Sequence, residues 1–200
     1  MPPIELSRLD LILAGVAGVA IAAACGLRAF LPLLALSIGV RFGLLHVDHS
    51  MAWIGWPPAM IALLWATVLE VAADKVPALD HLLDLIGTAL RPIAAALAGW
   101  VTFTGVHPAV GVMAALLLGA GAMGVHVAKA KVRLGSSMLT LGSANPVLSF
   151  IEDAIAIGLS AMAVLAPIAA LVAVILVVWA FRRVYRGPRR EPVAVAPLRE

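Results

Sequence analysis

Long apolar stretches separated by short polar ones set the pattern of this chain. Residues 92–125 and 154–181 contain no Asp, Glu, Lys or Arg. A bilayer core about 30 Å thick is crossed by about 20 apolar helical residues. The pattern therefore predicts spans near residues 10–26, 30–46, 58–75, 92–105, 108–128, 147–165 and 168–182. These are seven spans, or six if the first two segments form one broken span.

The junctions between these segments repeat a short motif in which a Gly is followed by a Pro. GLRAFLP occupies 26–32, GTALRP 87–92 and GSANP 142–146. Gly ends helices and Pro fits their first turn, so each motif predicts a stop and a restart. The recurrence predicts an all-α transmembrane bundle with internal hairpin repeats. Gly and Pro also serve packing in membrane helices, so a true repeat and simple packing both remain open.

Two stretches beside these motifs are too polar and too short to span. Residues 78–91 place leucines at helical spacing opposite Asp80, Asp84 and Thr88, and residues 134–146 carry hydroxyls and an amide. We expect both to be short amphipathic connectors. They either lie along the membrane interface or dip back into the membrane as re-entrant elements.

Composition and charge support one membrane domain and give it an orientation. The chain is 63% hydrophobic and 12% charged, so residues 10–182 are expected to form a single domain between an N-terminal segment, 1–9, and a disordered basic tail, 183–200. The predicted turns at 46–57, 104–108 and 166–167 contain no Lys or Arg. Of the 14 basic residues, only Arg8 and Arg41 fall on that side. The positive-inside rule makes the other side, with the C-terminus, cytoplasmic.

Charged residues next to these apolar segments are the candidates for chemistry, because an ionised group in the hydrocarbon costs at least about 2.5–3.5 kcal/mol near its centre. EVAADKV at 70–76 and HVAKAKV at 126–132 match in frame, with Glu70 opposite His126. Such an acid and base, if they face each other, can exchange a proton near neutral pH. The candidate substrate or proton pathway comprises Glu70, Asp74, His126, Lys129, Arg133, Asn145, Glu152 and Asp153, with Arg28 and Arg91 as anion contacts.

Structural explanations compete with a pathway at each of these positions. Lys75, Lys129 and Arg133 can extend to the headgroups and fix helix ends. Ser149 and Glu152 fit a capping box. Glu70 and His126 can form a buried structural pair.

Several blocks resemble one family of uncharacterised bacterial membrane proteins, domain-of-unknown-function family 4126. They are GLRAFLPLLAL, EVAADKVPALDHLLDLIGTALRP, the spacing of His126, Lys129 and Arg133, and NPVLSFIEDAIAI. The resemblance covers about residues 10–180. It implies a small, multi-pass helical protein of the bacterial inner (plasma) membrane and brings no established activity.

The function favoured by the residues is a small transporter or channel for an ion, a proton-coupled solute or an anionic lipid. One alternative is a structural or assembly protein, and a second is a metal-dependent lipid-phosphate enzyme with carboxylates around Mg²⁺. The chain has no HExxH, nucleophile elbow or phosphate-binding Gly-rich loop, so we assign no catalytic or metal residue and no cofactor. Membrane lipids are the expected partners, a homo-oligomer is compatible with the sequence, and the net charge of +3 lies in a tail that topology explains, which argues against nucleic acid.

Overall fold

The computed structural model describes residues 8–75, 77–103, 106–141 and 143–185, and these form helices without a strand. In chain order the elements are α1 (Arg8–Leu27), α2 (Phe30–Arg41), the 3-10 helix η1 (His49–Gly55), α3 (Pro57–Ala73), α4 (Pro77–Thr102), α5 (Pro108–Thr140), α6 (Asn145–Leu165) and α7 (Pro167–Tyr185). The all-α class is therefore confirmed. The predicted N-terminal segment and basic tail fall almost entirely outside the described residues, although α7 continues to Tyr185.

Proline sets the start of most of these helices. A Pro occupies the first or second position of α3, α5 and α6, and α4 and α7 begin at Pro77 and Pro167. Proline is suited to this place because the first amide groups of a helix have no partner within it. The predicted stops at 26–32 and 142–146 are confirmed, since α1 ends at Leu27 and α5 at Thr140.

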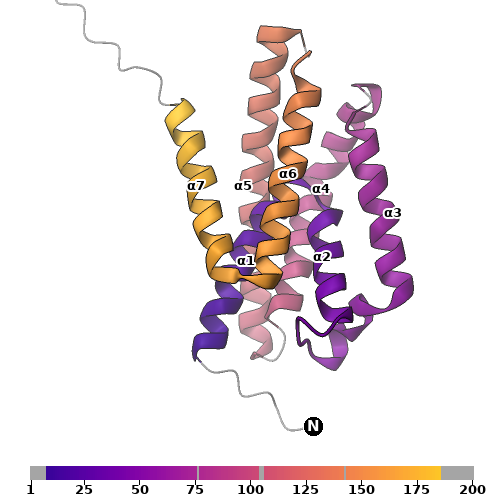
Figure 1. Cartoon of the computed structure of the whole chain (residues 1–200), viewed down its shortest axis with the longest axis vertical. Coiled ribbons are helices and arrows are strands. Elements are labelled where there is room, and N and C mark those ends of the chain that lie inside the picture. Colours follow the sequence, from indigo (N-terminus) through magenta and orange to yellow (C-terminus); the bar gives the residue numbers. More distant parts are fainter. Residues whose placement is uncertain (1–7, 76, 104–105, 142, 186–200) are drawn as a thin grey trace, which may run out of the picture.

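The helices form one bundle in which α1 has a central position. Figure 1 shows α1 rising from the lower end and α2 returning to it, so that the break between them lies below the upper ends of α5 and α6. From α3 to α7 the direction alternates, and the chain leaves α7 at the upper end. The loop before α3 and the α4–α5 and α6–α7 turns lie at the lower end, as the charge pattern predicts for one common side.

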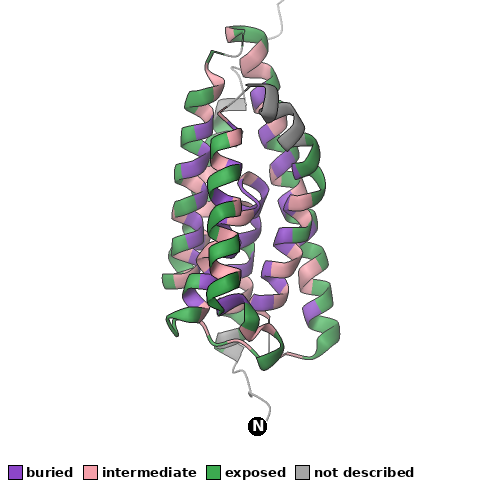
Figure 2. Cartoon of the chain, turned by 90° about the vertical axis from the view of Figure 1, so that its right-hand side faces the viewer, coloured by how far each residue is buried: buried purple, intermediate pink, exposed green. Residues whose placement is uncertain are grey.

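Small side chains allow the central helices to approach closely. Ala20, Ala24, Ala95, Ala98 and Ala122 are fully buried. At Gly26 a Cβ atom would lie 2.5 Å from Val125 Cβ and 2.6 Å from the carbonyl oxygen of Ala122, so α1 touches α5 at the end of α1. Figure 2 shows buried positions on the helix sides that face one another and exposed ones on the outside. This packing of small residues is typical of membrane bundles.

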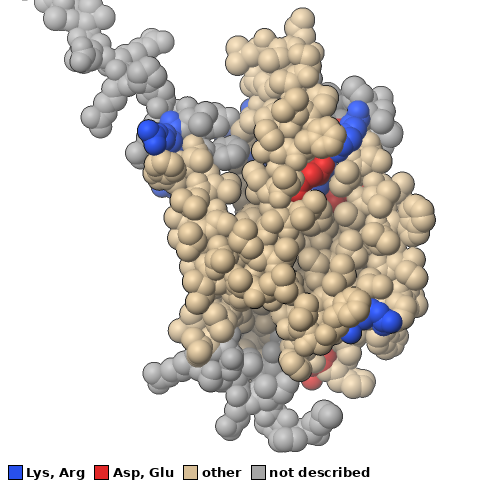
Figure 3. All heavy atoms as spheres, viewed as in Figure 1, with Lys and Arg blue, Asp and Glu red and all other residues tan. Residues whose placement is uncertain are grey.

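The outer surface and the helix lengths indicate a membrane protein. Three described helical segments are long and apolar enough to cross a bilayer: Leu85–Thr102, Pro108–Thr140 and Asn145–Leu165. The number rises to four if η1 and α3, bent by 56° from each other, count as one span. The prediction of seven spans is not confirmed, because the apolar segments Leu11–Leu27, Phe30–Arg41 and Pro167–Ala180 are shorter. Figure 3 shows an uncharged band between charged patches near the two ends of the visible face.

The two predicted connectors, 78–91 and 134–146, are not confirmed as separate elements. Residues 78–91 belong to α4, which continues through Pro92 to Thr102, and residues 134–140 are the last turns of α5. In an apolar surrounding an unbroken helix satisfies most backbone groups, which outweighs the single amide that Pro92 lacks. In α5 the hydroxyl of Thr140 donates to the carbonyl of Ser136 at 2.8 Å. The hydroxyl of Thr140 thus bonds to its own helix, which includes residues 134–140 without a break.

Candidate functional site

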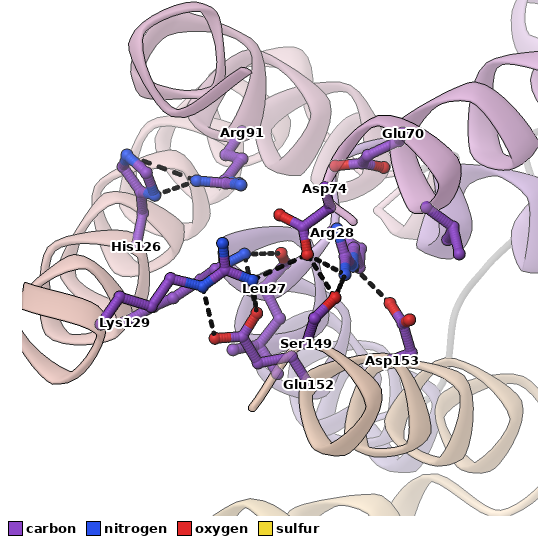
Figure 4. Close-up of polar contacts among 12 residues, drawn as sticks. Leu27, Arg28, Glu70, Asp74, Arg91, His126, Lys129, Ser149, Glu152 and Asp153 are labelled. Atoms are coloured by element: carbon purple, nitrogen blue, oxygen red, sulfur yellow. Dashed lines mark hydrogen bonds and ion pairs between the residues drawn. The ribbon is translucent and has the colours of Figure 1, made fainter. Parts of the chain in front are cut away.

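Charged side chains from four helices meet an arginine at the break between α1 and α2 (Figure 4). Arg28 lies in the break itself. The other members are Glu70 and Asp74 at the end of α3, Arg91 on α4, His126, Lys129 and Arg133 on α5, and Ser149, Glu152 and Asp153 on α6. These residues, together with Lys75 after α3, are called the charged cluster below. Apart from Lys75 they are between 0% and 9% exposed.

Regular helical spacing points each set of side chains in one direction. Glu70 and Asp74 are four residues apart, and His126, Lys129 and Arg133 are separated by three and four. Residues at these distances share a helix face. The faces of α3, α5 and α6 then surround the end of α1, so the local pattern of each helix produces a common buried site.

Asp74 is at the centre of the ion pairs. Its Oδ2 atom accepts from Arg28 Nη2 at 2.6 Å, from Arg133 Nη2 at 2.7 Å and from the hydroxyl of Ser149. The same hydroxyl accepts from Arg28 Nη2 at 3.0 Å. One carboxylate thus joins the α1–α2 break to α5 and α6. Charge-assisted hydrogen bonds of this kind are about twice as strong as neutral ones.

The two carboxylates of α6 complete the network on either side of Asp74. Glu152 pairs with Lys129 at 3.0 Å and with Arg133 at 2.9 Å. Asp153 pairs with Arg28 Nε at 2.6 Å and with Lys75 at 3.0 Å. Lys129 also donates to the carbonyl of Leu27, the last residue of α1. Buried charges are tolerated when they are paired in this way.

Glu70 binds the start of α2. Its Oε1 accepts from the amide of Ala29 at 2.8 Å and its Oε2 from the amide of Phe30 at 3.1 Å. The first amides of a helix have no partner within it and carry partial positive charge, so they bind anions. Glu70 therefore acts as an anion held at a helix N-terminus, although it comes from a different helix.

His126 has different partners from Glu70. Its ring contacts the guanidinium of Arg91 and the hydroxyl of Thr88, the latter at 3.2 Å. Figure 4 shows His126 and Glu70 on opposite sides of the charged cluster. The predicted direct pairing of Glu70 with His126 is therefore wrong. The two matching sequences lie in different places, 70–76 at the end of α3 and 126–132 inside α5. Glu70 binds the amides that begin α2 after the break at Arg28, and these backbone donors are not visible in the match.

A comparison with known protein families matched residues 16–187 to DUF4126, a domain of unknown function. The chain belongs to this family. No curated protein and no solved structure matched it. The resemblance of the charged blocks is thus confirmed, and in this DUF4126 chain those same blocks supply most of the charged cluster.

The DUF4126 chain has a cavity of about 340 Å³ at one side of the charged cluster, between the α1–α2 break, α3 and α4. Arg28, Glu70, Asp74 and Arg91 line it together with apolar side chains. Arg28 is fully buried, and its Nη1 atom has no hydrogen-bond partner within the described part of the chain. The cavity therefore joins a polar end, made by the break, to apolar walls.

The structure places nine of the ten candidate residues in the charged cluster. Asn145 is the exception, because it starts α6 and its amide donates to Ser137 at 3.0 Å. The capping-box alternative is wrong, since α6 begins at Asn145 and Ser149, four residues later, contacts Asp74. Lys129 is 3% exposed and pairs with Glu152, so it does not extend to the headgroups.

Sequence reasoning missed two contributors to the charged cluster. Ser149 was considered only as a cap, although it precedes Glu152 and Asp153 by three and four residues and so shares their helix face. Thr88 is the other, because its hydroxyl lies within hydrogen-bond distance of the His126 ring. Among the described residues, no group of three or more His, Cys, Asp and Glu is arranged to hold a metal ion. The carboxylates are instead held by cations or backbone amides.

Proposed function

We propose that this protein is a small transporter or channel, and that its solute crosses the bacterial inner membrane next to the charged cluster. The observation that carries the proposal is the α1–α2 break inside the bundle, which lies beside a cavity lined by four charged residues. In membrane transporters, the ends of discontinuous helices commonly form solute sites near mid-membrane. On this proposal the α1–α2 hairpin enters and leaves the membrane on one side.

The charge balance of the cluster favours an anion. Its cations are Arg28, Lys75, Arg91, Lys129 and Arg133, and its carboxylates are Glu70, Asp74, Glu152 and Asp153. Five positive minus four negative charges leaves one positive charge when His126 is neutral. The amides at the start of α2 add further positive potential. A small anion would neutralise the site, whereas a cation would add to its excess.

A second candidate is a structural or assembly role. The observation in its favour is the network around Asp74, in which Glu152 and Asp153 also have cationic partners. A cluster that only joins helices needs neither a cavity nor a polar atom without a partner. The two functions therefore make different demands on the cavity side of the cluster.

Flux through proteoliposomes tests the proposal. Purified protein is reconstituted with an internal pH dye, and uptake of protons, phosphate and radiolabelled lactate is followed under an imposed potential. We expect flux above empty liposomes that falls in Glu70→Gln and His126→Ala and persists in Asp48→Asn, which changes an exposed loop residue. Absence of flux for every solute contradicts transport of these solutes. Flux that is unchanged in both cluster variants contradicts the pathway.

A further inference from the structure

The amides that begin α2 form an anion site that is already filled by a side chain of the same protein. Both oxygens of Glu70 are used, one by each amide. A carboxylate from elsewhere would find the same two donors if Glu70 moved away. The residue that occupies the site thus indicates the chemistry that the site accepts.

A second observation independently indicates a ligand at this place. Arg28 is fully buried and lines the cavity, and its Nη1 atom has no hydrogen-bond partner within the described residues. A buried donor without a partner costs about 1–3 kcal/mol. Arg91 lines the same cavity. An anion in the cavity would give the Nη1 atom of Arg28 an acceptor.

The remaining walls of the cavity select the rest of the ligand. Phe30, Ala66, Leu69, Ala73 and Leu90 line it beside the charged end. Leu69 is 64% exposed on the outside of the bundle, so the cavity opens at the surface of α3. A volume of about 340 Å³ lies near the lower end of the range of about 300–1,000 Å³ for ligand sites. These walls suit a short aliphatic chain.

We propose that the cavity binds an aliphatic carboxylate, whose head takes the place of Glu70 at the start of α2 while its tail lies against the apolar wall. The inference rests on the proposed transport function for its biological meaning, but the binding site can be tested without transport. Glu70 is then an internal competitor that closes the site when no ligand is bound. Displacement of Glu70 by the ligand would open the α1–α2 break to the cavity.

Binding to purified protein in detergent tests this proposal. The probes are butyrate, which is water-soluble, decanoate, which partitions into membranes, neutral butyramide and inorganic phosphate. The apparent affinity equals the intrinsic affinity multiplied by the fraction of time the site is open. If Glu70 leaves the site open for about a tenth of the time or less, Glu70→Gln is expected to raise the affinity by about tenfold or more. Glu152→Gln is the matched comparison, since Glu152 is similarly buried but does not line the cavity, and its affinity gain is expected to be smaller.

Each result has a defined meaning. The proposal is supported if butyrate or decanoate binds, Glu70→Gln tightens that binding and butyramide does not compete equally. Binding of butyrate indicates a water-soluble acid, and binding of decanoate alone indicates an acid dissolved in the membrane. Equal affinity in wild type and Glu70→Gln, binding of phosphate alone, equal competition by butyramide, or no binding at all overturns it. If Glu70→Gln does not fold, Glu70→Asp is used, which keeps the charge and shortens the competing side chain. This variant must also bind the carboxylate probe more tightly than wild type, by a smaller factor.

The binding and flux results separate the two proposals. Carboxylate binding without flux contradicts transport and leaves the site intact. Flux of another solute without carboxylate binding contradicts this inference and leaves transport intact.

Discussion

Replacing Asp74 by Asn is the most direct test of what the charged cluster contributes to folding. Asp74 is 7% exposed, and one of its oxygens accepts from Arg28, Arg133 and Ser149. Asparagine keeps the shape but removes the charge. The substitution leaves two buried guanidinium groups with less negative charge near them, while Asp153 still pairs with Arg28 and Glu152 with Arg133.

The size of the effect follows from the burial of these groups. Removing one partner of a buried ion pair costs about 3–5 kcal/mol when the remaining charge is left without compensation, and Asp74→Asn reduces the compensation of two buried guanidinium groups at once. We expect Asp74→Asn to lower the free energy of unfolding by that amount. Ser149→Ala removes a neutral donor to the same oxygen, and we expect it to cost about 1 kcal/mol.

A double-variant cycle separates the ion pair from general damage to the site. In wild type Arg133→Met removes a cation that pairs with Asp74 and Glu152, whereas in Asp74→Asn it removes a cation that has already lost the charge of Asp74. Arg133→Met should lower the free energy of unfolding less in Asp74→Asn than in wild type. The difference between the two effects, which is the coupling energy of the pair, should be about 0.5–3 kcal/mol.

Reversible unfolding in mixed detergent micelles, followed by circular dichroism, measures these free energies. Asp48→Asn on the exposed loop is the control and should stay within about 0.5 kcal/mol of wild type. An Asp74→Asn variant as stable as that control, or strictly additive effects in the cycle, would refute the assignment of Asp74 as the centre of the cluster.

Two further predictions concern packing and orientation. Gly26→Ala places a Cβ atom against α5 and should lower the free energy of unfolding by about 1–3 kcal/mol in the same assay. The added Cβ of Gly124→Ala meets nothing within 4 Å, so this control should raise the free energy of unfolding by about 0.5–1 kcal/mol. Equal effects of the two variants would contradict the close approach of α1 to α5. Ser50→Cys and Ser143→Cys lie in exposed segments near opposite ends of the bundle. A membrane-impermeant maleimide should label Ser50→Cys in intact cells and Ser143→Cys only after permeabilisation, over a silent background because Cys25 is buried; the reverse order would invert the predicted orientation.

The sequence was sufficient for the helical class and for most helix ends, because these depend on local chemistry. Gly26 followed by Pro32, and Asn145 with Pro146, predicted breaks that the structure contains. Gly87 and Pro92 predicted a break in the same way, but α4 continues through both. A missing amide does not decide between a stop and a continuation by itself. The outcome depends on the apolar surroundings of the segment and on its packing against the neighbouring helix, and neither is visible in the motif.

The membership of the site was also largely predictable, while its pairing was not. Burial is expected for a charge in an apolar segment, and helical spacing gave the common faces of Glu70 with Asp74 and of His126 with Arg133. The partners come from other helices, so they depend on how those helices cross. For Glu70 the partner is a pair of backbone amides. Nearly every residue has a backbone amide, so the residue type does not show which amides can bind a side chain. Their availability depends on where a helix starts.

The break at Arg28 explains why a bundle so rich in alanine and glycine keeps a charged centre. Ending α1 and starting α2 inside the protein leaves backbone groups without partners, and the cluster satisfies several of them: Lys129 takes the carbonyl of Leu27, and Glu70 takes the first amides of α2. An unbroken helix satisfies its own backbone groups and needs no such side-chain partners. A break with a purely structural role would need these partners and nothing more. The chain instead retains a cavity beside the break, and Arg28 Nη1 has no acceptor among the residues that the structure describes. A ligand site needs both a cavity and a donor that can bind the ligand. Variants on the side of the charged cluster that faces α3 and α4 can therefore distinguish a ligand site from a purely structural cluster.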